Sequence, residues 1–387
     1  RLLGMSQGVS LESVYTPVRF INELNIRRFE SINTLEEAFR SCRRFQTSEC
    51  SSQDGITVAN KHQYLMVLGH PGAGKSTFLR RIGLEALKSG KGRFEHDLIP
   101  ILLELKQFKS DTVDLIDAIG KQFELFNFPS SKEFVSRALK EGKLLVLFDG
   151  LDEVPKKCTT SIIHAINNLV MKYEKNRYIA SCRIAAYRGD FRSDFRVIEL
   201  ADFDDKQIQQ FIINWFSTKL DKQSKTAKKC WDTLNQENNK AAKELAQTPL
   251  LLTFLCLVYN RKQNFPPNRS RLYNKALDIL LEEWAAEKRI QQEAIYEGLH
   301  TDSEIVMLSQ IAYESFVNYQ LFFDKKQIVD RIRDYLADTV DNPKYLDAQK
   351  ILQAIAAQQG ILVERAEDIY SFSHLTLQEY LTAQYIS

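Results

Sequence analysis

The chain has 387 residues, of which 26% are charged, and its formal net charge is only +2. A chain of this length can bury two or three hydrophobic cores, and its balanced charge excludes a bulk electrostatic argument for binding nucleic acid or an acidic membrane. The longest apolar run, residues 249–259, has about half the ~20 residues that a membrane-spanning helix needs. Six cysteines without a C-x-x-C pair favour reduced thiols over disulfides or zinc sites, and with no evident signal peptide they indicate a cytoplasmic protein.

The first sixty residues are mixed and polar. They contain a helical pattern at 33–45 and a segment rich in Ser, Gly, Asp and Asn at 48–61, which predicts a loop. We expect residues 1–60 to form an N-terminal extension or linker. Because the sequence begins at Arg1 without a methionine and ends within a helical pattern, we also expect it to be a piece of a longer protein.

Strand-length apolar runs alternate with helical patterns between residues 61 and 203. The predicted strands are 64–69, 98–106, 143–150, 177–183 and 195–203. Continuous apolar strands separated by amphipathic helices predict a parallel sheet with helices on both faces. We therefore assign residues 61–203 to one α/β domain.

Beyond residue 203 the alternation stops and helical patterns follow one another. Residues 204–268 predict a small, all-helical domain. In residues 269–387, helical patterns lead to two short strands, 361–365 and 368–373, and then to a closing helix. A helix, a two-stranded wing and a closing helix together predict a winged-helix domain.

A glycine-rich loop lies between the first predicted strand and the helix that follows it. Its sequence, GHPGAGKST, fits the phosphate-binding pattern G-x-x-x-x-G-K-[ST]. Glycines let successive backbone N–H groups point at anionic oxygens, the lysine reaches the outer phosphates, and the serine hydroxyl can bind Mg²⁺. The predicted nucleotide-binding residues are Gly69, His70, Pro71, Gly72, Ala73, Gly74, Lys75, Ser76 and Thr77.

A second motif, DGLDEVP, ends the predicted strand at 143–150. Asp149 would stand at the sheet edge beside the phosphates and, with Ser76, would hold Mg²⁺. On the exit loop, Glu153 is our first choice and Asp152 our second for accepting a proton from the attacking water. Arg183 ends the next strand and is a candidate for detecting the terminal phosphate.

Taken together, these motifs resemble the NACHT NTPases of the signal-transducing (STAND) class. The resemblance rests on GHPGAGKST, KEGKLLVLFDGLDEVP, SCR, TPLLLT and FSHLTLQEYLTAQY in this order, and it covers roughly residues 60–387. It implies a P-loop nucleotide-binding domain, then a small helical domain, then a winged-helix domain that folds back over the nucleotide. It also implies that the closed form holds ADP, and that exchange for ATP opens the chain and allows it to form homo-oligomers.

The resemblance carries two further residues into the site. Pro249 of TPLLL would pack by the adenine and ribose, and His374 of FSH would reach the β-phosphate from the winged-helix domain. Two positions depart from the family: Ile184 stands where proline is common, and Ser181 stands where threonine is expected. A sensor for the unknown activating ligand would lie beyond residue 387.

The leading hypothesis is an ATP/ADP-dependent switch with slow, Mg²⁺-dependent hydrolysis, acting in innate immunity or, as a bacterial member of the family, in antiphage defence. The alternative is a nucleic-acid-directed ATPase that uses its winged helix on DNA. Such a helix should present clustered Lys and Arg, but the closing helix from residue 374 onward carries none. A kinase lacks an evident acceptor site here, and the intact acids argue moderately against a module that binds nucleotide without hydrolysing it.

Overall fold

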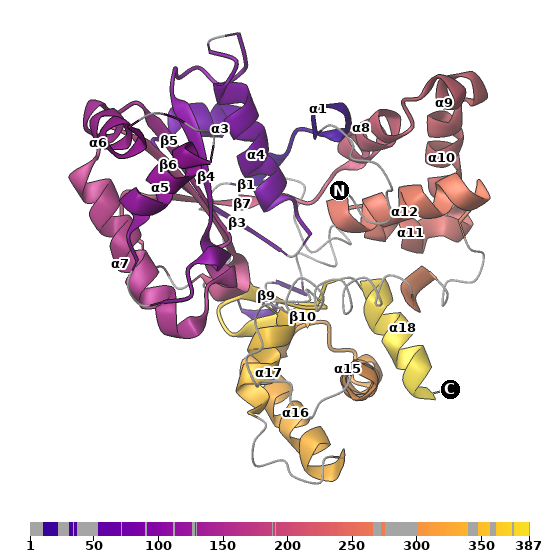
Figure 1. The fold of residues 1–387 in the computed structure, drawn as a ribbon. Helices are drawn as coiled ribbons and strands as arrows, with labels where there is room; N and C mark the ends of the chain where they lie inside the picture. Colours follow the sequence, from indigo (N-terminus) through magenta and orange to yellow (C-terminus); the bar gives the residue numbers. More distant parts are fainter. Residues whose placement is uncertain are drawn as a thin grey trace.

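The computed structural model describes most of the chain. The described residues are 11–21, 31–33, 35–36, 53–70, 72–89, 91–110, 113–125, 128, 130–187, 189, 191–265, 272–274, 301–339, 347–356, 361–373 and 375–386. Figure 1 shows a sheet flanked by helices α4 to α7, a helical region from α8 to α12 beside α1 (Leu11–Val14), and a separate group of elements from α15 to α18. This order of layers is the predicted one: an α/β domain, then helices, then a winged helix.

The sheet has seven strands in the order β2-β1-β7-β3-β6-β5-β4. Its parallel part runs from β7 to β4. The parallel strands are β3 (Tyr64–Gly69), β4 (Ile99–Glu104), β5 (Leu144–Asp149), β6 (Arg177–Arg183) and β7 (Arg196–Leu200). Strand β6 therefore lies between the strand that leads into the glycine-rich loop and the strand that ends in the acidic motif.

Both faces of the parallel sheet are buried, as the continuous apolar runs predict. Leu65 and Val67 of β3 share one core with α4 (Lys75–Ala86), whereas Met66 and Leu68 share the opposite core with the other flanking helices. Those helices are α5 (Leu115–Glu124), α6 (Ser131–Glu141) and α7 (Lys156–Lys172). Short 3₁₀ turns follow three of the strands: η2 (Leu105–Gln107), η3 (Leu151–Glu153) and η4 (Ile184–Ala186).

The N-terminal part of the chain adds to this sheet. Strands β1 (Arg19–Ile21) and β2 (Gln53–Asp54) pair antiparallel with each other, and β1 pairs antiparallel with β7. The predicted loop at 48–61 is wrong for residues 53–61, because β2 leads directly into helix α3 (Gly55–Lys61). The Asp54 side chain caps this helix by accepting hydrogen bonds from the backbone N–H groups of Ile56 and Thr57.

The helical region contains short helices that begin directly after the sheet. They are α8 (Asp205–Trp215), α9 (Lys219–Ser224), α10 (Thr226–Leu234), η5 (Glu237–Asn239), α11 (Lys240–Leu245) and α12 (Pro249–Lys262). Pro249 occupies the first turn of α12, where a missing N–H costs nothing. Among the described residues, no helix is both long enough and apolar enough to cross a membrane.

The last group of elements has winged-helix order. It comprises α15 (Thr301–Val317), β8 (Phe323–Asp324), α16 (Lys325–Thr339), α17 (Ala348–Ala354), β9 (Leu362–Ala366), β10 (Ile369–Phe372) and α18 (Leu375–Ile386). The wing has a third strand that the sequence did not predict, because β8 pairs with β10. The helix before the wing is α17, so the DNA alternative has to be tested on α17 rather than on the closing helix α18.

Candidate nucleotide-binding site

The glycine-rich loop joins β3 to α4, as predicted. Gly72 and Gly74 have φ angles of +72° and +96°, which lie in the left-handed region that favours glycine. Gly74 is the N-cap of α4 and supplies no capping side chain, so the positive end of α4 faces the loop. The Lys75 ammonium donates hydrogen bonds to the carbonyl oxygens of Gly69, at 2.9 Å, and His70, at 3.1 Å. This geometry suits a bound phosphate.

Burial makes the charged form of the Lys75 side chain less favourable in free energy than it is in water. Loss of hydration lowers the pKa of Lys75 from 10.5 to about 8, and the Asp152 carboxylate opposes that shift. An anion in the loop would favour the charged ammonium in the same way, because an opposite charge within a few ångströms stabilises it. The environment of Lys75 therefore favours an anionic ligand.

A hydroxyl and a carboxylate predicted to hold Mg²⁺ are brought together from two elements. Asp149 Oδ1 accepts a hydrogen bond from Ser76 Oγ at 2.9 Å, although the two residues are 73 positions apart. Asp149 is only 6% exposed. Mg²⁺ prefers oxygen ligands, and in proteins it commonly keeps several bound waters and contacts the phosphates of the substrate. Because waters and phosphates fill most of its coordination positions, one hydroxyl and one carboxylate from the protein fit the ion.

Ser181 has a part in this arrangement that sequence reasoning missed. Its hydroxyl donates to Asp149 Oδ1 at 2.8 Å and accepts from the backbone N–H of Gly150 at 2.9 Å. Ser181 therefore fixes both the Asp149 carboxylate, a predicted metal ligand, and the first peptide of the acidic loop. The sequence offered two hints: Ser181 lies two residues before Arg183 on the same strand, and it stands where the family is expected to have threonine.

Arg183 and Asp152 form a nearly buried ion pair. Arg183 Nε lies 2.7 Å from Asp152 Oδ2, and the side chains are 6% and 5% exposed. The backbone N–H of Arg183 also donates to Asp152 Oδ1 at 3.0 Å. Both carboxylate oxygens of Asp152 are thus engaged, which favours a positioning role over proton transfer.

Glu153 has different surroundings from its neighbour. Burial, and secondarily the Asp152 charge, raise the pKa of Glu153 from 4.5 to about 7. Gly150 has a φ of +78° and turns the chain so that the Glu153 side chain comes back over it. A carboxyl group that titrates near neutral pH is suited to proton transfer. This supports the sequence-based order of preference between Glu153 and Asp152.

The helical region packs directly against the glycine-rich loop. The backbone N–H of Leu250, one residue after Pro249, donates to the carbonyl oxygen of Gly72 at 3.4 Å. A Cβ on Gly72 would lie 2.8 Å from Leu250 Cβ, so this approach requires glycine. The start of α12 therefore lies beside the glycine-rich loop, while the expected packing of Pro249 by the adenine and ribose stays a prediction.

Some of the remaining predicted residues lie within the described part of the chain, and two lie outside it. His70 lies 3.8 Å from Glu199 Oε1 of β7, while Ala73 and Thr77 belong to the loop and the first turn of α4. Pro71 and His374 lie outside the described residues, so the predicted contact from the winged-helix domain stays a prediction. Within the part of the chain that the structure describes, no group of three or more metal-ligating side chains was found.

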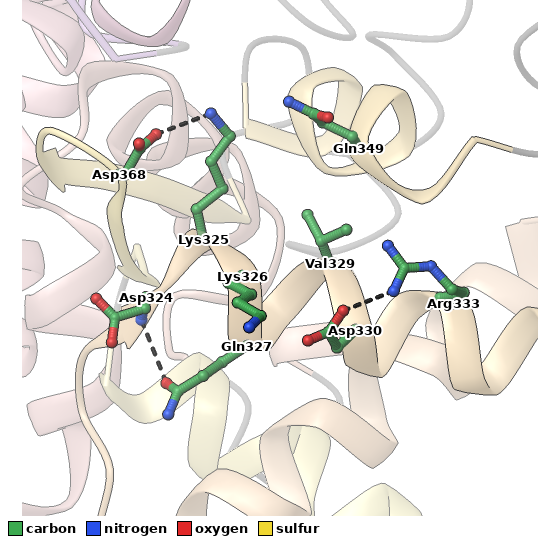
Figure 2. A pocket seen from close by; sticks show the side chains of 9 residues that line it. All are labelled: Asp324, Lys325, Lys326, Gln327, Val329, Asp330, Arg333, Gln349 and Asp368. Carbon is green, nitrogen blue, oxygen red and sulfur yellow. Dashed lines mark hydrogen bonds and ion pairs between the residues drawn. The ribbon is translucent and has the colours of Figure 1, made fainter.

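A surface pocket lies elsewhere, in the winged-helix region (Figure 2). Its lining residues are Asp324, Lys325, Lys326, Gln327, Val329, Asp330, Arg333, Gln349 and Asp368. Lys325 pairs with Asp368 at 2.8 Å and Arg333 with Asp330 at 2.6 Å, so much of the charge in this pocket is already compensated. None of the predicted site residues lines this pocket.

The chain is similar to known proteins in sequence and in fold. An uncharacterised WD repeat-containing protein of Nostoc sp. is 23% identical over 352 residues, which cover 83% of this chain and 21% of that protein. The chain thus spans about a fifth of that relative's length. Similar structures include the RuvB Holliday junction branch migration motor of Thermotoga maritima (TM-score 0.34, 11% identity, 91% of this chain and 92% of that one) and AMPPCP-bound DnaA of Aquifex aeolicus (TM-score 0.35, 14% identity, 77% and 90%).

The family models match two separate parts of the chain. The model of the NACHT domain matches residues 63–219, which hold the glycine-rich loop, the acidic motif and Arg183. The model of the winged helix-turn-helix domain C-terminal to NACHT matches residues 269–386. These two matches, in this order and on this fold, confirm the resemblance seen in the sequence: the chain belongs to the NACHT family of P-loop NTPases.

Proposed function

We propose that this protein is an ATP/ADP-dependent switch whose bound nucleotide controls the positions of the helical and winged-helix domains. The observation that carries the proposal is the contact of both domains with the site's own loops. Leu250 of α12 donates to the carbonyl of Gly72, and strand β9 lies beside η4, the turn that directly follows Arg183. A ligand shifts a conformational equilibrium only through interactions that differ between the two states, and these contacts provide such interactions.

The residues of the site divide the work of hydrolysis. Mg²⁺, when bound by Ser76 and Asp149, would neutralise charge on the outer phosphate oxygens. Lys75 binds those phosphates, and Glu153 accepts a proton from the attacking water. Arg183 would meet the terminal phosphate after exchanging its contact with Asp152 for one with the nucleotide. Breaking this buried pair costs free energy that the new contact with the nucleotide has to offset, which is consistent with slow turnover.

The proposed resting state holds ADP and the proposed active state holds ATP and is a homo-oligomer in the cytoplasm. By likeness to its family, we place this switch in innate immunity or bacterial antiphage defence. The activating ligand would bind a region outside this sequence.

The winged-helix charges favour the switch over a DNA-directed ATPase. The basic side chains of α16 and α17 are largely paired with acids: Lys325 with Asp368, Arg331 with Glu314, Arg333 with Asp330, and Lys350 with Asp347. DNA binding by such a domain needs clustered cations that are free to meet phosphates. Charge pairing thus weakens the alternative on α16 and α17, and α18 carries no basic side chain at all.

The test is to identify the nucleotide that co-purifies with the protein and to compare the particle mass in ADP with that in a non-hydrolysable ATP analogue. We expect bound ADP, a monomer in ADP and a larger particle with the ATP analogue. An identical mass and identical hydrogen exchange in both nucleotides would reject the switch. Hydrolysis stimulated by DNA would instead support the nucleic-acid-directed ATPase.

A further inference from the structure

The sequence offers no motif for residues 11–36, yet the described residues of this stretch contact the sheet, the helical region and the winged-helix region. We call the described part of this stretch the N-terminal arm (11–21, 31–33 and 35–36). Its strand β1 belongs to the nucleotide-binding sheet, where Phe20 pairs with Leu200 of β7. Beyond β1 the chain reaches the winged-helix domain and then returns to the sheet at β2. The arm is therefore anchored in the sheet on both sides of its distant contact.

The distant contact is a small apolar cluster that is separate from the two large cores. Its buried members are Leu35, Phe322, Ala366 and Ile369, with Ile32 and Leu321 packed against them. Leu35 is 1% exposed. The winged-helix members come from the segment before β8 and from the facing strands β9 and β10. A side chain of the arm thus covers the hydrophobic surface of the wing.

A second contact joins the arm to the helical domain. Arg19 NH2 lies 2.9 Å from Asp204 Oδ2, and Arg19 Nε donates to Gln207 Oε1 at 3.0 Å. Asp204 and Gln207 form the capping box that begins α8. Gln207 Nε2 in turn donates to the carbonyl of Pro17 at 2.7 Å. The arm therefore holds the first turn of the helical domain, at the point where the chain leaves the sheet.

A third contact reaches the helix that follows the glycine-rich loop. Glu12 lies 2.9 Å from Lys88 Nζ, just beyond the end of α4, and the Arg81 guanidinium stands 5.1 Å from the centre of the Tyr15 ring. Asn214 of α8 donates to the Tyr15 carbonyl at 3.0 Å. Around Tyr15, the arm thus touches α4 and α8 at once.

We propose that the N-terminal arm is an intramolecular brace that holds the helical and winged-helix domains against the nucleotide-binding sheet. Because Leu35 is buried in the apolar cluster of the wing, separating the winged-helix domain from the arm would expose apolar surface that Leu35 now covers. The link between this brace and nucleotide exchange rests on the proposed switch, whereas the packing of the domains by the arm does not depend on it.

The test compares Leu35→Asp with Asn33→Asp, which adds the same charge at an exposed position of the same segment. Hydrogen exchange of the amides in residues 362–372 is followed by mass spectrometry, first without nucleotide and then with ADP. We expect exchange there to become about tenfold faster or more in Leu35→Asp, equivalent to about 1.4 kcal/mol, and to stay unchanged in Asn33→Asp. Exchange in the core strands β3 and β6 should not change in either variant, which shows that the sheet is still folded.

Unchanged exchange in 362–372 of a folded Leu35→Asp variant would overturn the brace. If Leu35→Asp does not fold, Leu35→Ala replaces it, with the same readout and a smaller acceleration expected. Arg19→Ala should speed exchange in the first turn of α8 and leave the wing unchanged, and an unchanged α8 would also count against the proposal. If the wing loosens in Leu35→Asp but the wild-type protein has the same particle mass and the same hydrogen exchange in ADP and in the ATP analogue, the brace stands and the switch is rejected.

Discussion

Removing the Asp152 carboxylate should destabilise the nucleotide-binding domain far more than removing the Glu153 carboxylate next to it. Asp152 accepts two bonds from Arg183, one from the side chain and one from the backbone, and both side chains are at most 6% exposed. Removing one partner of such a buried pair leaves an uncompensated charge, which typically costs about 3–5 kcal/mol. Asp152→Ala should therefore lower the free energy of unfolding by about that amount.

The assay is urea unfolding at pH 7, followed by the fluorescence of the native domain, for Asp152→Ala, Glu153→Gln and wild type. Glu153→Gln is the matched control, because it removes a neighbouring carboxylate that is only partly ionised at this pH. It should change the free energy of unfolding by about 1 kcal/mol or less. Arg183→Met combined with Asp152→Ala should recover much of the loss, since replacing both partners of a buried pair is often close to neutral. Equal destabilisation by the two single variants would refute this reasoning.

Three further predictions concern the site. Lys75→Ala should abolish ATP and ADP binding in calorimetric titration, and unchanged affinity would reject the phosphate-loop assignment. Glu153→Gln should keep nucleotide affinity but slow turnover by about 10²-fold or more. Wild-type turnover should rise as the pH passes about 7, because Glu153 can accept a proton only once it is ionised and its pKa is raised to about 7. A turnover rate that stays constant from pH 5 to 9 would oppose this role. Ser181→Ala leaves the buried Gly150 N–H without its acceptor and Asp149 without one donor, so the free energy of unfolding should fall by about 1–3 kcal/mol, measured against Ser181→Thr.

The same raised pKa has a consequence for stability. The pKa of Glu153 is about 7 in the folded protein and near 4.5 when unfolded, so the folded state binds the extra proton between these values. Stability contributed by Glu153 is therefore present at low pH and is lost as the pH rises through about 7. The Glu153→Gln variant should lose this part of the pH dependence.

The parallel sheet was predictable because its strands are buried on both faces. Such strands are continuous apolar runs, and these stand out between amphipathic helices. Strands β1 and β2 escaped prediction because three and two residues carry no periodicity. The segment at 53–61 looked like a loop because Asp54 and Gly55 are common in turns, whereas here Asp54 starts a helix. Strand order was not predictable either, since it depends on pairing between distant segments.

The sequence could predict the site residues that belong to local motifs, but not the contacts between distant segments. Lys75, Ser76 and Asp149 were expected from spacing alone, and the structure places Ser76 and Asp149 within a hydrogen bond of each other. The contact between Leu250 and Gly72 joins parts of the chain that carry separate motifs, so no local pattern reports it. For the same reason, the sequence could rank Asp152 as a possible base but could not show that Arg183 already occupies it.

Strand β6 lies between β3 and β5, and its register sets the positions of two side chains of the site, Ser181 and Arg183. Ser181 and Arg183 are two residues apart, so they point to the same side of the sheet, while Cys182 points into the core on the opposite side. A slip of β6 by one residue would turn the Arg183 side chain into the apolar core, away from Asp152, and bring the Cys182 thiol to the Asp149 carboxylate. The position of Asp149, the predicted metal ligand, and that of Arg183, the predicted phosphate sensor, are therefore coupled through β6, and any movement of this strand alters both together.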